Sequence, residues 1–143
     1  MWYNKNEEEK GAQMTTTIYT DGSTRDICFI IGNQHPKIRA ATEGPNPVTV
    51  NAGEYYALLQ AMHVARAQGI RDIIVKSDSQ LMVRQLTKKP DGSYVYKVKT
   101  PSLFLLHTLV KDLEEDFNSV TYKWVPREQN LAGIELEKLA KGK

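Results

Sequence analysis

The order of strand-like and helix-like runs is the feature that most constrains the fold of this chain. Three runs typical of strands come first, at residues 15–20, 26–32 and 37–43, and turn signals such as those at 32–36 separate them. Runs typical of helix, strand, helix, strand and helix follow. Short turns favour antiparallel pairing of the first three strands, whereas a helix between two strands implies a parallel pair with a right-handed crossover. The order predicts an α/β fold in which helices flank a mixed five-stranded sheet.

Start and stop signals define the later elements. Asn51 is expected to begin a helix that ends before Gly69, and Asn51 and Glu54 have the spacing of a capping box. Thr100 is expected to cap another helix, with Pro101 at its first position. Asn130 is expected to cap the last one. The remaining expected elements are strands at 72–76 and 119–125 and helices at 79–86, 101–117 and 131–141.

Length and composition are those of one soluble domain, because 143 residues with 41% hydrophobic and 25% charged residues suffice for one core. Residues 1–14 are polar, so we expect a disordered tail before a domain at 15–143. The apolar runs are shorter than the roughly 20 residues that span a bilayer. We therefore expect a cytoplasmic protein with no membrane partner. Cys28 lies in an apolar run, where a buried, unreactive thiol is expected.

Three carboxylates stand in distinctive local contexts. Asp21 and Asp78 lie at the ends of strand-like runs, and Glu54 lies at the start of a helix-like run. A sheet with one packed helix would bring all three together. Such an oxygen cluster suits Mg²⁺, which binds through a few carboxylates, water and substrate phosphates. Taken singly, the same residues also fit a turn, a capping box and an N-cap.

Five segments, in the same order, resemble ribonuclease H type 1 of the bacterial and archaeal branch, over about residues 15–141. The segments are 19–23, 51–54, 77–81 with Val83, 96–101 and 124–130. The resemblance implies a ribonuclease H-like fold and a metal-dependent endonuclease that hydrolyses the RNA strand of RNA–DNA hybrids. It further implies two Mg²⁺ ions, or Mn²⁺ in their place, that activate water and stabilise the leaving oxygen. We expect a monomer without a small-molecule cofactor.

The resemblance also assigns roles to residues. Asp21 would bridge both ions, Glu54 would lie on the side of the attacking water, and Asp78 would complete the metal ligands. Substrate contacts are expected from five further residues near the RNA strand: Gly22, Ser23, Asn51, Gln80 and Asn130. A hybrid is recognised through its shape, phosphates and 2′-hydroxyls, so short polar side chains and backbone N–H groups suffice at these positions.

The fourth carboxylate of the family is missing at its expected place. An ungapped comparison puts Ile134 there, and a shorter spacing found in some members puts Gly133 there. Glu135 and Glu137 are the nearest carboxylates, and the helical turn of about 100° per residue lets at most one face the site. We hypothesise that one of them substitutes: Glu137 if the position is Gly133, and Glu135 if it is Ile134. The alternative is that both are solvated surface charges.

The loop before the last helix departs from the family as well. Many relatives carry a histidine there, whereas this chain has Arg127. An arginine cannot act as a general acid near neutral pH, but its fork can hold a phosphate or a leaving group. We hypothesise that Arg127 takes part of that role; the alternative is a solvent-facing arginine. A basic group that flanks two tyrosines is a candidate for the DNA strand's phosphates: Lys88, Lys89, Lys97 and Lys99.

Two other functions remain open on the sequence. The first is a binding module with a lapsed site that holds nucleic acid or a protein partner, which the missing fourth carboxylate favours. The second is a nuclease of the same fold that acts on another nucleic acid, because one fold can support several activities. Retention of Asp21, Glu54 and Asp78 favours an enzyme.

Overall fold

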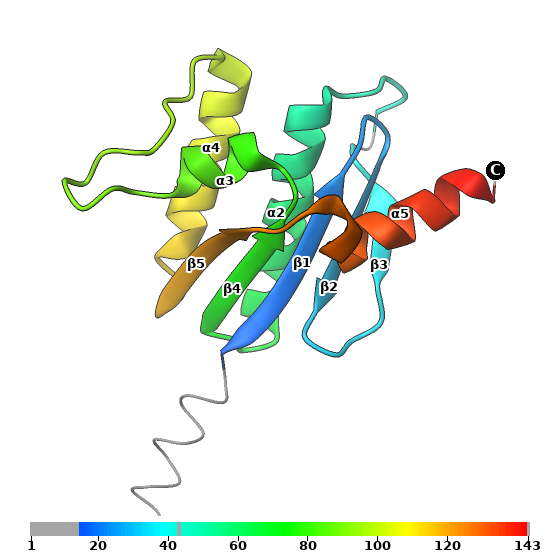
Figure 1. The fold of residues 1–143 in the computed structure, drawn as a ribbon, viewed down its shortest axis with the longest axis horizontal. Coiled ribbons are helices and arrows are strands. Elements are labelled where there is room, and N and C mark those ends of the chain that lie inside the picture. The colour runs from blue at the N-terminus through cyan, green and yellow to red at the C-terminus, as the bar shows by residue number, and fades with distance from the viewer. Residues whose placement is uncertain (1–14, 43, 143) are drawn as a thin grey trace, which may run out of the picture.

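The computed structural model describes residues 15–42 and 44–142, which form one sheet with helices on both faces (Figure 1). The sheet has five strands: β1 (Thr16–Gly22), β2 (Asp26–Ile31), β3 (Lys37–Ala40), β4 (Asp72–Ser77) and β5 (Ser119–Trp124). Their order is β3-β2-β1-β4-β5. The pairs β1–β2 and β2–β3 are antiparallel, and β1–β4 and β4–β5 are parallel. The predicted mixed sheet is confirmed, whereas the predicted tail lies outside the described residues.

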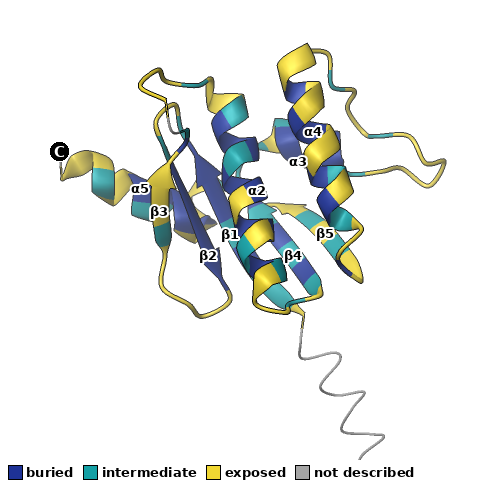
Figure 2. Ribbon diagram, turned by 180° about the vertical axis from the view of Figure 1, so that it is seen from behind, coloured by how far each residue is buried: buried dark blue, intermediate teal, exposed yellow. Residues whose placement is uncertain are grey.

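The helices lie in two layers. Behind the sheet in Figure 1 are α2 (Val50–Ala67) and α4 (Pro101–Glu114), which Figure 2 shows from that side. The short helix α3 (Gln80–Leu86) lies beyond the ends of β4 and β5, next to α4, and its Met82 and Leu86 belong to the main core. The last helix, α5 (Leu131–Lys141), packs alone on the opposite face, against β1 and β2. Among the described residues, no helix is long and apolar enough to cross a bilayer.

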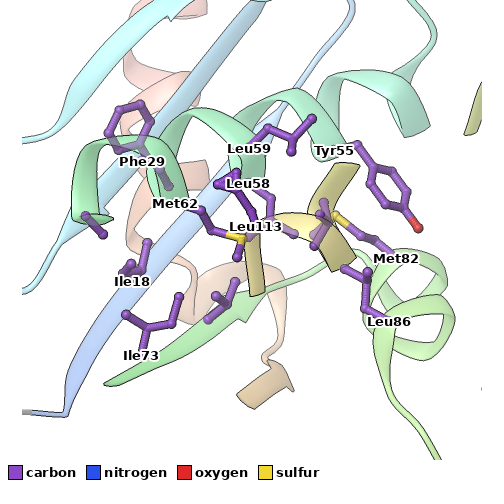
Figure 3. Packing of buried hydrophobic residues seen from close by; sticks show 14 of the residues in the cluster. Ile18, Phe29, Tyr55, Leu58, Leu59, Met62, Ile73, Met82, Leu86 and Leu113 are labelled. Carbon is purple, nitrogen blue, oxygen red and sulfur yellow. The ribbon is translucent and has the colours of Figure 1, made fainter. Parts of the chain in front are cut away.

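The main core lies between the sheet and the α2–α4 layer (Figure 3). Alternate residues of the strands point into it because strand side chains alternate between the two faces. Ile18 and Ile73 from the strands meet Leu58 and Met62 of α2 there. Val110 of α4 packs against the same cluster and is fully buried.

A smaller cluster fixes α5 on the other face. Cys28 and Ile30 of β2 pack against Ala132 and Leu136 of α5. Cys28 is completely buried, as expected, and burial raises the pKa of its thiol to about 12. The thiol therefore stays protonated and unreactive near neutral pH.

Several predicted boundaries are corrected by local hydrogen bonds. The N-cap of α2 is Thr49, whose hydroxyl accepts a bond from Ala52 N at 3.1 Å, so the capping box expected from Asn51 is wrong. The helix α4 ends at Glu114 and not near Phe117, because Phe117 reaches the core through a turn. The caps expected at Thr100 and Asn130 are in place, although only Asn130 makes a side-chain cap bond.

Candidate metal centre

Three carboxylates meet at the carboxyl ends of β1 and β4. Asp21 belongs to the end of β1, Asp78 follows β4, and Glu54 lies near the start of α2. One ligand oxygen from each lies within 4.8 Å of the other two. Asp21 and Glu54 are buried, and Asp78 is half-buried. The fold therefore brings together the three carboxylates that the sequence singled out.

Two glycines let β1 and α2 approach closely enough to form this cluster. A Cβ atom on Gly22 would lie 2.1 Å from Gly53 O, and one on Gly53 would lie 2.1 Å from Ser23 O. Real Cβ atoms do not come so close to backbone oxygens, so the two backbones are in direct contact only because neither residue has a side chain. Across this contact, Gly22 N donates a hydrogen bond of 2.9 Å to Glu54 Oε1.

The cluster holds more negative charge than its surroundings compensate. Burial raises the pKa of Asp21 to about 7, and repulsion from Asp78 adds to the effect. Burial also raises the pKa of Glu54 to about 9, again with repulsion from its neighbours. Oxygen ligands that repel one another suit a hard divalent ion, whose binding removes this repulsion. The cluster is therefore compatible with divalent metal binding.

Asn130 clamps the cluster from the side of α5. Its amide nitrogen donates to Asp78 Oδ1 at 2.7 Å and to Thr20 O at 2.9 Å. Its side-chain oxygen accepts a bond from Ala132 N at 3.2 Å and so caps α5. The side chain is completely buried, so the expected substrate contact would have to replace one of these internal bonds. One residue thus fixes β1, Asp78 and α5 relative to each other.

The structure locates the position on α5 from which a fourth carboxylate would reach the cluster. A Cβ atom on Gly133 would lie 3.4 Å from Asp21 Oδ2, so position 133 faces the cluster directly. Ile134 is the next residue and is turned about 100° around the helix. Gly133 is therefore a position from which a side chain would point at Asp21.

Of the two candidate replacements, Glu137 lies beside the cluster. It follows Gly133 by four residues, one helical turn further along the same face. It also lines a cleft of about 480 Å³ together with Asp21 and Glu54. Glu135 instead pairs with Lys138 at 3.5 Å.

Arg127 is a cation that hydrogen bonds connect to the cluster. It belongs to a 3-10 turn, Arg127–Gln129, between β5 and α5. Its Nε donates to Glu137 Oε1 at 2.9 Å, and its terminal nitrogen lies 3.4 Å from Asp78 Oδ2. The same arginine lines the cleft of about 480 Å³. Arg127 is thus bonded to the cluster, while more than half of its side chain is exposed.

Of the other expected substrate residues, Gly22 and Ser23 line this cleft, whereas Asn51 and Gln80 are not among the described residues that line it. The Ser23 hydroxyl accepts a bond from Asp26 N at 3.2 Å in the β1–β2 turn. Asn51 and Gln80 are exposed at the starts of α2 and α3. A second cleft of about 430 Å³ lies beside Asn51 and is lined by Lys97 and Lys99 among others.

The basic loop between α3 and α4 is held by aromatic contacts. The ring of Tyr94 meets the ring of His107 edge-on at 4.7 Å, and Lys111 Nζ lies 5.0 Å from its centre. Lys88 Nζ lies 5.6 Å from the same centre on the loop side. Tyr94 therefore anchors the loop to α4, a role that the sequence did not reveal for His107 or Lys111.

Comparison with known proteins places this arrangement in a family. The family profile described as "Reverse transcriptase-like" matches residues 23–140, most of the chain. The chain belongs to the reverse transcriptase-like family. One curated relative is the "Bifunctional protein Rv2228c" of Mycobacterium tuberculosis, 33% identical over 82 residues. That alignment covers 57% of this chain and 21% of the relative, so the chain spans about a fifth of the curated relatives it matches.

Solved structures show that this reverse transcriptase-like chain has the ribonuclease H fold. RNase H1 from the halophilic archaeon Halobacterium salinarum NRC-1 superimposes with a TM-score of 0.73 at 24% identity, over 89% of this chain and 98% of that one. LC11-RNase H1 in complex with an RNA/DNA hybrid gives a TM-score of 0.70 at 27% identity, over 85% and 93% of the two chains. The resemblance read from the sequence motifs is thereby confirmed.

Three contacts of this reverse transcriptase-like site were not foreseen. They are the bond from Asn130 to Asp78, the pair Arg127–Glu137, and a bond of 3.2 Å from Trp124 Nε1 to Asp78 O. Each involves the segment 124–137. A strand followed by a loop and a capped helix was visible in the sequence, but which of its polar groups turn inward depends on the packing of α5.

Proposed function

We propose that this protein is a metal-dependent endonuclease that hydrolyses the RNA strand of RNA–DNA hybrids by a two-metal-ion mechanism. The observation that carries the proposal is the mutual approach of Asp21, Glu54 and Asp78 to within 4.8 Å, at the carboxyl ends of β1 and β4. The ribonuclease H fold around the cluster supports it. So does the complex of the structural relative LC11-RNase H1 with an RNA/DNA hybrid.

The residues divide the work of binding the metals, with Mg²⁺ as the expected ion and Mn²⁺ as its alternative. Divalent ions at this position would activate water and stabilise the leaving 3′ oxygen. Asp21 is assigned the bridging role, with Glu54 on the side of the attacking water. Asn130 holds Asp78 Oδ1, which leaves Oδ2 directed to the cleft side where Arg127 lies.

Glu137 is the proposed fourth carboxylate. Position 133 faces Asp21, but Gly133 has no side chain to offer. Glu137 lies one turn further on the same face and is long enough to reach back toward the cluster. Glu135 pairs with Lys138 and is not among the described residues that line the cleft. The length of the Glu137 side chain would thus make up for the distance of one helical turn between position 137 and position 133.

The nucleic acid is expected to lie across the starts of α2 and α3. Backbone N–H groups of Gly22 and Ser23 and the side chains of Asn51 and Gln80 are assigned to the RNA strand. The DNA strand would follow the basic loop, whose lysines are exposed: Lys88, Lys89, Lys97 and Lys99. Arg127 is assigned to a phosphate of the cleaved strand, because its planar fork matches phosphate oxygens.

Cleavage of a labelled RNA–DNA hybrid with Mg²⁺ or Mn²⁺ tests the proposal, with the unaltered protein compared with Asp21→Asn. We expect cutting of the RNA strand that needs the metal and is abolished by the substitution. Duplex DNA and duplex RNA serve as matched substrates. Cutting of either in preference to the hybrid would identify a nuclease of the same fold with another substrate.

A binding module with a lapsed site is the second candidate, because Gly133 offers no ligand at the position that faces Asp21. A folded protein that binds the hybrid but cuts it with neither ion would establish this alternative. Asp21→Asn would then leave binding unchanged.

The remaining expectations belong to the same proposal. We propose that residues 15–143 act as one monomeric, cytoplasmic domain without a small-molecule cofactor. Light scattering of the purified protein would test the monomer, and fractionation of cells would test the location.

A further inference from the structure

Arg127 uses the same oxygens that a divalent ion would need. Its Nε donates to Glu137 Oε1 at 2.9 Å, and its terminal nitrogen contacts Asp78 Oδ2 at 3.4 Å. The other oxygen of Asp78 already accepts from Asn130. Both oxygens of Asp78 and one of Glu137 are therefore engaged by side chains of the protein itself.

The position of Arg127 makes these contacts easy to exchange. Its side chain is 58% exposed, and its partners Glu137 and Asp78 are 45% and 12% exposed, so the stronger of the two contacts, that with Glu137, is an exposed ion pair. Exposed ion pairs contribute little, because water screens them and because long side chains lose freedom in forming them. Asn130, in contrast, is buried and makes three internal bonds. A metal that enters can displace Arg127 without disturbing the clamp.

We propose that Arg127 is an internal counter-cation of the carboxylate cluster, which a divalent ion displaces and which then binds a phosphate of the nucleic acid. The inference rests on the proposed function for its second half only. Because the arginine cannot hold carboxylates and a phosphate with the same nitrogens, metal binding would precede tight substrate binding. The guanidinium would thus become available to a substrate phosphate only when the metal site is filled.

Metal affinity tests the first half without any cleavage. Titration calorimetry with Mn²⁺ alone would compare the unaltered protein with Arg127→Ala, Arg127→Lys and Lys138→Ala. Removal of a competing, exposed ion pair should tighten metal binding of Arg127→Ala by about two- to fivefold. Arg127→Lys, which keeps the charge but not the fork, should fall between. Lys138→Ala removes one positive charge from α5 without removing a contact of Asp78 or Glu137, and should change the metal affinity little.

Unchanged or weaker metal binding in Arg127→Ala would overturn the proposal, as would an equal gain in Lys138→Ala. The exposed position of Arg127 predicts that the variant still folds, and its melting temperature in EDTA would verify this. Weaker metal binding would mean that Arg127 organises the carboxylates instead of competing for them.

Hybrid binding tests the second half. Fluorescence anisotropy with Ca²⁺, with the RNA strand checked on a gel for integrity, is compared with the same measurement in EDTA. Arg127→Ala should weaken hybrid binding severalfold in Ca²⁺ and leave it almost unchanged in EDTA, where the arginine is occupied by carboxylates. An equal weakening in both conditions would overturn the displacement.

These results separate the inference from the proposed function. Tighter metal binding by Arg127→Ala in a protein that cuts no nucleic acid would support the counter-cation and refute the nuclease. A protein that cuts the hybrid but binds metal equally well with and without Arg127 would refute only the proposal that Arg127 is a counter-cation.

Discussion

Burial raises the pKa values of Asp21 and Glu54, and the free energy of unfolding should therefore depend on pH. The raised pKa values, about 7 for Asp21 and about 9 for Glu54, mean that the native protein keeps protons that the unfolded chain releases near pH 4. The native state then binds more protons than the unfolded state, so the free energy of unfolding falls as pH rises through this window. Without metal we expect a fall of up to about 1.4 kcal/mol per pH unit for each carboxyl.

Urea denaturation in EDTA between pH 5 and pH 8 measures this fall. Glu54→Gln should flatten the curve, because the amide has no proton to lose. Added Mg²⁺ should flatten it as well, since a bound cation favours the charged carboxylates. A metal-free stability that rises with pH over this range would contradict the expected charge state.

The choice between Glu135 and Glu137 gives a second prediction. Glu137→Gln should lower kcat/KM for hybrid cleavage at least tenfold, because Glu137 lines the cleft and contacts Arg127. Glu135→Gln serves as the matched change two residues away and should cost far less, because Glu135 pairs with Lys138. The opposite order in a kinetic comparison would make Glu135 the substitute.

At the level of single residues, the sequence singled out the carboxylates and also Arg127, Asn130 and Glu137, but not the contacts between them. Asp21, Glu54 and Asp78 were found because each follows or begins a recognisable element. Whether position 133 or 134 faces the cluster could not be read from spacing, since it depends on how α5 is rotated against β1. Packing of Ala132 and Leu136 against Cys28 and Ile30 sets that rotation.

Between elements, the contact of β1 with α2 is the feature of the site that tolerates least change. Gly53→Ala would add a Cβ atom 2.1 Å from Ser23 O and force the two backbones apart. Alanine is intrinsically better in a helix by roughly 0.5–1 kcal/mol, so the sign of the result tests the contact. We expect a net decrease of about 1–3 kcal/mol in the free energy of unfolding, together with loss of cleavage.

Gly44→Ala is the matched control for this substitution. A Cβ atom at Gly44 would have no heavy atom within 4 Å, so its effect should stay within about 0.5 kcal/mol. Thermal denaturation of both variants decides the comparison. A Gly53→Ala protein as stable and active as the unaltered one would show that α2 can move away without harm.

The start of α2 shows why an expected cap can fail. Asn51 and Glu54 have the spacing of a capping box, but Thr49 caps the helix instead. Glu54 is not available as a cap because its carboxylate accepts a hydrogen bond from Gly22 N of the neighbouring strand β1. The local pattern was genuine, and a contact between residues 32 positions apart overrode it.

At the scale of the whole molecule, the loop between α3 and α4 carries four exposed lysines on the side where the DNA strand is expected. The net charge is only +2, so affinity should depend on the basic loop and not on the overall field. Replacing Lys97 and Lys99 by alanine should make the dependence of log affinity on log salt less steep. The magnitude of the slope should fall by roughly one for each phosphate that the protein no longer neutralises. Lys37→Ala, on the opposite edge strand β3, should leave the slope unchanged. Binding measured from low to high salt checks both.

The architecture was predictable because each of its rules acts on element order. Three strands joined by short turns formed the antiparallel half, and helices between strands formed the parallel half. The placement of α5 alone on one face was not predictable in detail, since its narrow apolar side could pack on several positions of the sheet. That placement completes the site.

The bond from Asn130 to Thr20 O joins residues 110 positions apart, so it forms late in the synthesis of this part of the chain. A ribosome adds roughly 5–20 residues per second, starting at the N-terminus, so all three carboxylates emerge before Asn130, which holds Asp78. A nascent chain that has reached only β5 carries Asp21, Glu54 and Asp78 without Asn130 or Glu137. Activity of the proposed nuclease should therefore appear only after α5 has left the ribosome.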